Sequence, residues 1–184
     1  KERRSMRTLS GKKDPDQVAD AIIHHADVRR MLLTQKAFAE GGRSMIYHAA
    51  RYADKMTEAA NSGDHDEFEK WDDKLGFYTP VLKGFLTERG IEAANIGMQV
   101  YGGHGYIKEW GMEQIARDAR IATLYEGTTG VQALDLLGRK VLVQSKGKVV
   151  RDYTANIMRW CGEYALDKDM RRFVWVLTKL CAEW

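Results

Sequence analysis

The stretch YEGTTGVQALDLLGRK, from Tyr125 to Lys140, holds residue types that could do acid–base chemistry. Glu126 is a single carboxylate between a tyrosine and a glycine, and Thr128 and Thr129 precede a mostly apolar, helix-like run. Gly127 has no side chain to crowd a ligand beside that carboxylate. In an apolar cleft Glu126 could act as a general base. A glutamate near a helix start also suits the helix dipole without any catalytic role, so local sequence leaves both interpretations open.

A glycine-rich turn, YGGHGY from Tyr101 to Tyr106, is a second candidate. Backbone N–H groups in such a turn can approach phosphate oxygens because no Cβ stands in the way. The spacing matches neither the dinucleotide-binding nor the P-loop pattern, and no strand-like segment precedes it. A plain interhelical turn explains the same residues, so phosphate contact stays a hypothesis here.

The histidines do not form a metal-binding pattern. His24 and His25 are adjacent, so on a helix they point to different faces and cannot chelate one ion together. His48 and His65 have no partners at the spacing of zinc ligands. We therefore predict no metal site.

Composition favours a helical globular domain. The 184 residues can bury a core, and 44% are apolar while 30% are charged. Only two prolines occur, and good helix formers outnumber β-branched runs. No apolar stretch approaches the roughly 20 residues that span a bilayer, and the basic start does not resemble a signal peptide. We therefore expect no membrane span and a cytoplasmic protein, in which Cys161 and Cys181 are reduced thiols.

Charge is uneven along the chain. Residues 1–13 hold six Lys/Arg against one Glu, whereas the segment from Asp54 to Lys74 holds eight acids against three lysines. A nucleic-acid binder usually shows a stronger and more continuous basic face than the net charge of +3 allows, so we predict no nucleic-acid partner. The basic arm could still meet phosphate groups of a small ligand.

The spacing of apolar residues predicts helices that would position these candidates. One long helix is expected from Asp16 to about Asn61, passing through Gly41-Gly42 without a change of phase. A short helix is expected from Asp64, its N-cap, to about Leu75, and a long one from Thr79-Pro80, its start, to about Val100. Two more are expected from about Gly111 to Leu124 and from Thr128 or Thr129, as N-cap, to about Val143. A final pair is expected between Val149 and Trp184, with Asp167 near their junction. Together they predict an all-α, up-and-down four-helix bundle with additional C-terminal helices.

The segment from Ala93 to Lys140 closely resembles the C-terminal signature of the acyl-CoA dehydrogenases. QVYGGHG, RDARI and YEGT occur in that family's order, as Q-x-x-G-G-x-G, R-D-A-R-I and Y-E-G-T. The resemblance continues upstream through HHADVRRMLLTQKAFAEGGR and covers most of residues 1–140. The extra helices beyond Val141 resemble the larger bacterial-type branch, which includes broad-chain-length and methylthiopropionyl-CoA dehydrogenases. The resemblance implies that residues 1–143 form the family's C-terminal bundle and residues 144–184 begin an extra helical segment.

The resemblance also implies roles for particular residues. Glu126 stands where the family's glutamate abstracts the α-proton of an acyl-CoA thioester, while FAD takes the β-hydrogen as hydride. Gly127 and Tyr125 stand at substrate-binding positions. Residues at the family's FAD-binding positions are Arg3, Ser5, His25, Gln99, Gly102, Gly103, Thr128, Thr129 and Gly130. The common pattern has an aromatic residue and a glycine after the arginine motif, whereas this chain reads RRSMRTLSGKKDP.

The implied protein is a homodimer or homotetramer with FAD at a subunit interface, acyl-CoA as substrate, electron-transfer flavoprotein as acceptor and a place in fatty acid β-oxidation. Two alternatives remain. A flavin-dependent acyl-CoA oxidase would keep the same glutamate and produce peroxide, and a non-catalytic DNA-associated relative would bind DNA with a steep salt dependence. Because the family's β domain covers the flavin, residues 1–184 alone are expected to bind FAD weakly or not at all and to turn nothing over.

Overall fold

The computed structural model describes residues 2–183, so Lys1 of the basic arm and Trp184 of the last predicted helix lie outside the described residues. Those residues contain no β-strand, only one isolated antiparallel bridge between Arg4 and Ala21. The all-α prediction is confirmed. The elements are η1 (Ile22–His24), α1 (Ala26–Ser62), α2 (His65–Tyr101), α3 (Gly103–Tyr106), η2 (Lys108–Trp110), α4 (Met112–Ile121), α5 (Thr129–Leu134), the π-helix η3 (Asp135–Gln144), α6 (Lys148–Glu163) and α7 (Arg171–Ala182).

Helix α1 passes through Gly41-Gly42 without interruption, as predicted, but the predicted start at Asp16 is wrong. The segment before Ala21 is a folded loop, because the carboxylate of Asp20 accepts hydrogen bonds from the main-chain N–H groups of Thr8, Lys13 and Asp14. A polar side chain that captures local backbone donors competes with helix formation in this way.

Helix α2 is continuous, so the predicted break before Thr79-Pro80 is wrong. Asp64 does cap it, since its Oδ1 accepts the N–H of Glu67 at 3.0 Å. Proline has no N–H for the carbonyl four residues earlier, which here belongs to Gly76. The ammonium group of Lys140 donates to that carbonyl oxygen instead. The Thr79 hydroxyl, predicted as an N-cap, donates to the Leu75 carbonyl at 2.8 Å.

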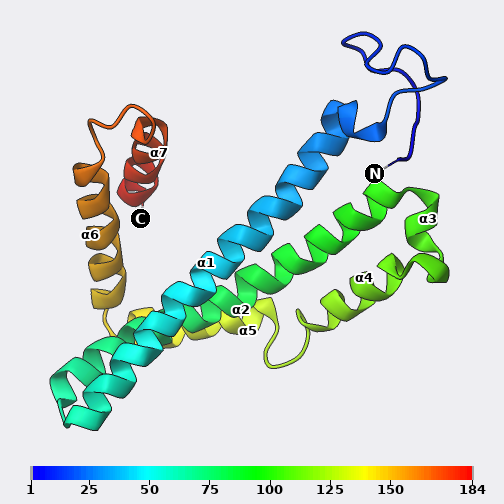
Figure 1. Cartoon of the computed structure of the whole chain (residues 1–184). Helices are drawn as coiled ribbons and strands as arrows, with labels where there is room; N and C mark the ends of the chain where they lie inside the picture. Colours follow the sequence, from blue (N-terminus) through cyan, green and yellow to red (C-terminus); the bar gives the residue numbers. More distant parts are fainter. Residues whose placement is uncertain (1, 184) are drawn as a thin grey trace. The chain divides into compact units, whose positions relative to one another are not determined.

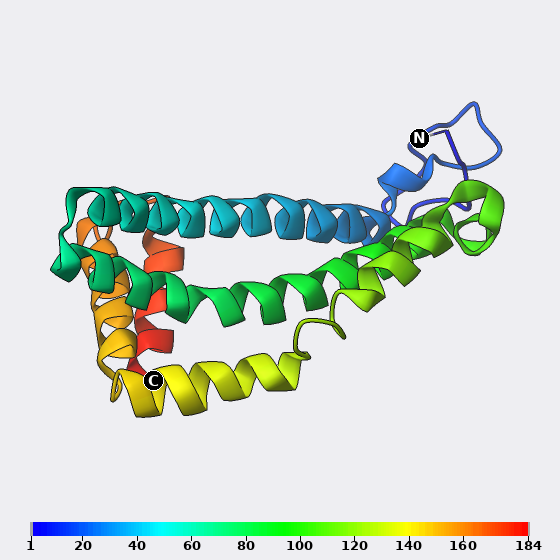
Figure 2. The ribbon, with the colours of Figure 1, turned by 90° about the horizontal axis from the view of Figure 1, so that it is seen from below.

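The chain divides into two compact units, and the first comprises residues 1–51 and 81–132. Within it, the first part of α1 lies antiparallel to the last part of α2 (Figures 1 and 2). The Arg89 guanidinium lies 5.5 Å from the Phe38 ring centroid, and a Cβ on Gly42 would lie 3.1 Å from Leu86. Helices α3 and α4 follow the turn at Gly102, where α2 ends as predicted.

The second unit comprises residues 52–80 and 133–184. Helices α6 and α7 lie side by side in it (Figures 1 and 2), and Oδ1 of Asp167 at their junction accepts the N–H groups of Asp169 and Met170. Phe77 and Tyr153 rings, 5.4 Å apart, join α2 to α6. Cys161 and Cys181 are free thiols, and Cys161 is buried. Two such helices near Asp167 were predicted, and this is confirmed.

The run predicted from Thr128 or Thr129 to Val143 is helical, but its second part is a π-helix that the apolar spacing did not indicate. The N–H of Ser145 donates to the carbonyl of Lys140, five residues back, at 3.0 Å. Within residues 2–183 no helix is long and apolar enough to cross a membrane.

Candidate functional site

The turn between α4 and α5 places Glu126 in an unusual backbone conformation. Its φ is +54°, in the left-handed region, and Gly127 follows with φ +91°. A left-handed conformation costs an ordinary L-residue about 1–2 kcal/mol, which glycine avoids. A strained residue of this kind persists only where surrounding contacts hold it.

Two side chains hold the carbonyl groups of this turn. Nε2 of Gln132 donates to the Glu126 carbonyl at 3.1 Å, and the Lys83 ammonium donates to the Gly127 carbonyl. A Cβ on Gly127 would lie 2.7 Å from Nε2 of Gln132. Only glycine therefore lets the Gln132 amide come this close.

The two threonines that follow lie at the start of α5. The carbonyl of Thr128 accepts the N–H of Gln132 at 2.9 Å, and its hydroxyl oxygen lies 3.5 Å from the N–H of Val131. The Thr129 hydroxyl donates to Oε1 of Glu88 on α2 at 2.7 Å. The predicted N-cap at this turn is confirmed by the Thr128 contact, and Thr129 instead joins α5 to α2.

The Glu126 side chain itself is exposed, and so are the residues Tyr125, Thr128, Thr129 and Gly130. Residues 2–183 therefore do not enclose this carboxylate in an apolar cleft. Its position leaves it open to a molecule that approaches the turn, while the backbone that carries it is anchored from two sides.

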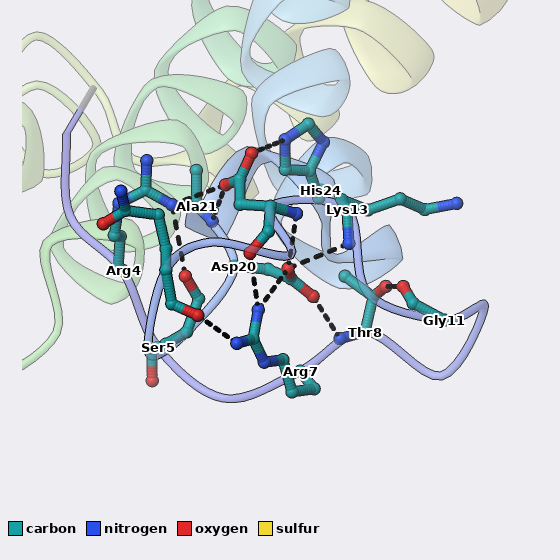
Figure 3. A network of polar contacts seen from close by, with 12 residues as sticks. Arg4, Ser5, Arg7, Thr8, Gly11, Lys13, Asp20, Ala21 and His24 are labelled. Carbon is teal, nitrogen blue, oxygen red and sulfur yellow. Dashed lines mark hydrogen bonds and ion pairs between the residues drawn. The ribbon is translucent and has the colours of Figure 1, made fainter.

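A second group of predicted residues lies around the N-terminal arm, which a buried carboxylate organises (Figure 3). Asp20 has no exposed surface, and its oxygens accept the N–H groups of Thr8, Lys13 and Asp14 at 2.9 Å each, with Arg7 at 3.1 Å. These donors, the Asp14 N–H first, hold the pKa of Asp20 well below its usual range.

The arm brings Arg3 against the glycine turn at the end of α2. Nη1 of Arg3 donates to the Val100 carbonyl at 3.0 Å. Gly102 has φ +63°, and a Cβ there would lie 2.9 Å from the same nitrogen. Glycine at this position therefore makes room for the guanidinium, whose remaining N–H groups can still donate to an anion.

Ser5 and His25 join the same group. Nε2 of His25 lies 2.7 Å from the Ser5 carbonyl, and the N–H of Ser5 donates to the Asp20 carbonyl at 3.1 Å. Gln99 closes the adjoining turn through its carbonyl, which accepts the N–H of Gly102 at 3.0 Å. A Cβ on Gly103 would meet no atom within 4 Å, so the turn is open on that side.

The predicted site residues thus fall into two groups within the first unit. The first group surrounds Glu126 and contacts α2 at Lys83 and Glu88, and the second surrounds Arg3 and meets α2 from Gln99 onward. Gln99 lies eleven positions after Glu88 on α2, which is about 16 Å along the helix axis. The points at which the two groups contact α2 are therefore well separated along this helix.

Sequence reasoning missed the residues that hold both groups in place. Lys83 is 44 residues from Gly127, so no local pattern could link them. Gln132 had a local signal, a long amide one helical turn after a glycine-containing break. Asp20 stood in a segment wrongly predicted as helix. Gly105 belonged to the recognised motif, but its role is packing, since a Cβ there would lie 2.4 Å from the Met98 carbonyl. In the described part of the chain no three His, Cys, Asp or Glu side chains cluster as metal ligands would.

Comparison with known proteins supports the resemblance in these motifs. Residues 6–142 match the family model described as acyl-CoA dehydrogenase, C-terminal domain. The chain is 44% identical over 147 residues to 3-methylmercaptopropionyl-CoA dehydrogenase of Ruegeria pomeroyi, an alignment that covers 80% of this chain and 24% of the relative. It is 34% identical over 160 residues to a butyryl-CoA dehydrogenase of Syntrophomonas wolfei, covering 87% of this chain and 25% of the relative.

A third relative is the broad-specificity linear acyl-CoA dehydrogenase FadE5 of Mycobacterium tuberculosis, 37% identical over 140 residues, which cover 76% of this chain and 22% of the relative. The chain thus spans about a quarter of the length of the curated relatives it matches. Among solved structures, a chain of the Bd2924 apo-form has the same fold, with a TM-score of 0.64, 18% identity and coverage of 90% of this chain and 33% of that one. A chain from the electron transferring flavoprotein study of Acidaminococcus fermentans has a TM-score of 0.52 at 22% identity. That match covers 70% of this chain and 29% of the other.

Proposed function

The chain belongs to the acyl-CoA dehydrogenase family, and on that premise we propose that Glu126 is the catalytic base of an acyl-CoA dehydrogenase. Its carboxylate would take a proton from the α-carbon of an acyl-CoA thioester. The observation that carries the proposal is the turn itself, an exposed glutamate in left-handed backbone followed by a glycine, at the family's Y-E-G position.

The reaction asks for a base that is held close and oriented, because an α-proton beside a thioester is only weakly acidic. The α-C–H bond breaks and its proton moves to Glu126, the β-C–H bond breaks, and a double bond forms between the α- and β-carbons. Gly127 leaves the approach to the carboxylate free on one side, and Tyr125 flanks it on the other. FAD, when bound, supplies the acceptor for the β-hydrogen as hydride.

The residues of the second group fit an anionic part of that cofactor. Arg3 offers a guanidinium beside a glycine turn that is open at Gly103, and Ser5 and His25 lie next to it. A guanidinium and unobstructed backbone N–H groups are suited to phosphate oxygens. We assign Gln99, Gly102 and Gly103 to the same contact, and Thr128, Thr129 and Gly130 to a contact beside Glu126.

The separation of the two groups along α2 supports a shared cofactor site. In our proposal one copy supplies the Glu126 group and a second copy supplies the Arg3 group, so that FAD lies at the interface of a homodimer or homotetramer. Electron-transfer flavoprotein is the proposed electron acceptor, and the proposed location is cytoplasmic. Residues 1–143 would be the family bundle and 144–184 the start of an extra helical segment.

The test is Glu126→Gln in the full-length protein that carries this chain. The protein is mixed without oxygen with butyryl-CoA, 3-methylmercaptopropionyl-CoA and longer thioesters while flavin absorbance is followed. We expect flavin bleaching to slow by about 10²–10⁴-fold with FAD content unchanged. Glu40→Gln, at an exposed position on α1, is the matched control and should bleach normally. Undiminished bleaching in Glu126→Gln would remove this residue from the mechanism.

A further inference from the structure

We propose that Lys83 and Gln132 are positioning residues that set the direction of the Glu126 side chain. They do so by donating hydrogen bonds to the main-chain carbonyl groups of Glu126 and Gly127. This inference rests on the proposed role of Glu126 as the base. Neither residue belongs to the motifs Q-x-x-G-G-x-G, R-D-A-R-I or Y-E-G-T, and the assignment comes from their contacts alone.

The two contacts act on consecutive carbonyl groups. Gln132 donates to the Glu126 carbonyl at 3.1 Å and Lys83 to the Gly127 carbonyl. A carbonyl oxygen only accepts, so each contact requires an N–H donor, which is Nε2 of the Gln132 amide in one case and Nζ of Lys83 in the other. Fixing two successive carbonyls fixes the peptide planes on either side of Gly127, and the first of these planes begins at the Cα of Glu126.

The donors come from different elements. Gln132 lies on α5, directly after the turn, whereas Lys83 lies on α2. These elements lie close together at Gly84, where an added Cβ would be in ordinary van der Waals contact, 3.8 Å from Cβ of Gln132 and 3.9 Å from Thr129. The Thr129–Glu88 hydrogen bond closes the same contact one helical turn further along α2.

The backbone at Glu126 needs such support. Its φ of +54° is one that residues other than glycine rarely adopt, so a released turn would relax toward commoner conformations. Relaxation would rotate the Cα–Cβ bond of Glu126 and move the carboxylate away from the α-carbon of the substrate. A misplacement of about 1 Å in a reacting group can lower a rate by about 10²-fold.

The experiment uses Gln132→Met and Lys83→Met in the full-length, FAD-loaded protein. Both variants keep a long side chain and remove the donor. We expect the rate constant of flavin reduction at saturating acyl-CoA to fall about 10- to 100-fold, while the concentration of acyl-CoA giving half of that rate changes less than about threefold. Lys83→Arg keeps a donor and should recover most of the rate. Gln114→Met and Lys36→Met, at exposed positions, serve as controls with wild-type rates.

Three further measurements separate positioning from a general loss of structure. The effect of Lys83→Met should be smaller in the Gln132→Met background, because both act on one turn. Amide hydrogen exchange in residues 125–129 should accelerate in both variants and in neither control. FAD content and the temperature midpoint of unfolding should stay close to wild type.

The outcomes distinguish this inference from the proposed function. If Glu126→Gln abolishes flavin reduction while Lys83→Met and Gln132→Met reduce flavin at the wild-type rate, the positioning role is wrong and the base stands. Equal losses in Lys83→Arg and Lys83→Met would also overturn it, since donor chemistry would then be irrelevant. If Glu126→Gln reduces flavin normally, the proposed function itself is wrong.

Discussion

The main-chain nitrogen of Thr8 donates to Oδ2 of Asp20 at 2.9 Å, and the carboxylate that accepts it has no exposed surface. The segment from Thr8 to Asp20 is thereby folded back on itself, and Arg3, just before it, lies at the end of α2. A single buried carboxylate thus determines the conformation of the arm that holds the proposed cofactor contacts.

Asp20→Asn should loosen this arm in a pH-dependent way. The folded pKa of Asp20 is lowered, so its stabilisation is complete above the unfolded value of about 3.9 and is lost as the pH falls toward the folded value. At pH 7 the variant should therefore exchange the amide hydrogens of Thr8, Lys13 and Asp14 faster than wild type, and the difference should shrink below about pH 4. Asp16→Asn, at an exposed position, is the control. A difference independent of pH would contradict this account.

Arg3→Gln should weaken FAD binding. A hydrogen bond to a charged group contributes about 1.5–3 kcal/mol, so the dissociation constant should rise about 10- to 100-fold. The dissociation constant is measured by titrating FAD into the apo form of the full-length protein and recording flavin fluorescence. Arg29→Gln, at an exposed position on α1, should bind FAD as wild type does. Unchanged affinity in Arg3→Gln would remove Arg3 from the cofactor site.

Gly127→Ala should impair both stability and flavin reduction. The added methyl group would lie 2.7 Å from Gln132 and the backbone would be held at φ +91°, which together should cost about 1–3 kcal/mol of unfolding free energy. Gly90→Ala is the contrasting variant, because that helical glycine has no atom within 4 Å of an added Cβ and should gain up to about 1 kcal/mol. Urea unfolding and flavin bleaching measure the two effects, and a Gly127→Ala protein with wild-type values would show that the turn is not constrained.

Lys140→Met should destabilise the protein more when Pro80 is present than when alanine replaces it. The carbonyl of Gly76 then loses its donor, at a cost of about 1–3 kcal/mol. Pro80→Ala supplies a main-chain N–H for the same carbonyl, so Lys140→Met should cost less in that background. Urea unfolding of the four proteins gives the coupling energy. Lys148→Met, at an exposed position, should change the free energy of unfolding equally in both backgrounds. If Lys140→Met also cost the same with and without Pro80, its hydrogen bond would not compensate for the proline.

The sequence predicted the helical runs well where apolar spacing was regular, as through Gly41-Gly42 and around Asp167. The prediction failed where a distant or polar group overrides the local preference for helix or loop. A proline normally begins or ends a helix, but α2 continues through Pro80, where the Lys140 ammonium supplies the donor that proline lacks. The segment after Asp16 looked helical, but Asp20 draws its backbone into a loop.

In the candidate site, too, local sequence indicated some residues, whereas others depend on contacts between distant elements. Glu126, Gly127 and the glycine turn were found because their types and order are local features of the sequence. The structure brings Arg3, Ser5, His25 and Gly102 together, as the resemblance implied, while their binding of FAD stays a prediction. Lys83 could not be found from sequence, because its contact with Gly127 exists only once α2 and α5 have packed.

The contact between Gly76 and Lys140 has a consequence for how this chain can be divided. Helix α2 ends at Tyr101, but one of its main-chain carbonyls accepts a hydrogen bond from a side chain 64 positions away. A truncation that ended before residue 140 would leave every residue of α2 in place and still remove part of its bonding. The shortest fragment in which α2 keeps all of these bonds is therefore defined by Lys140, and boundaries for expression should be placed after it.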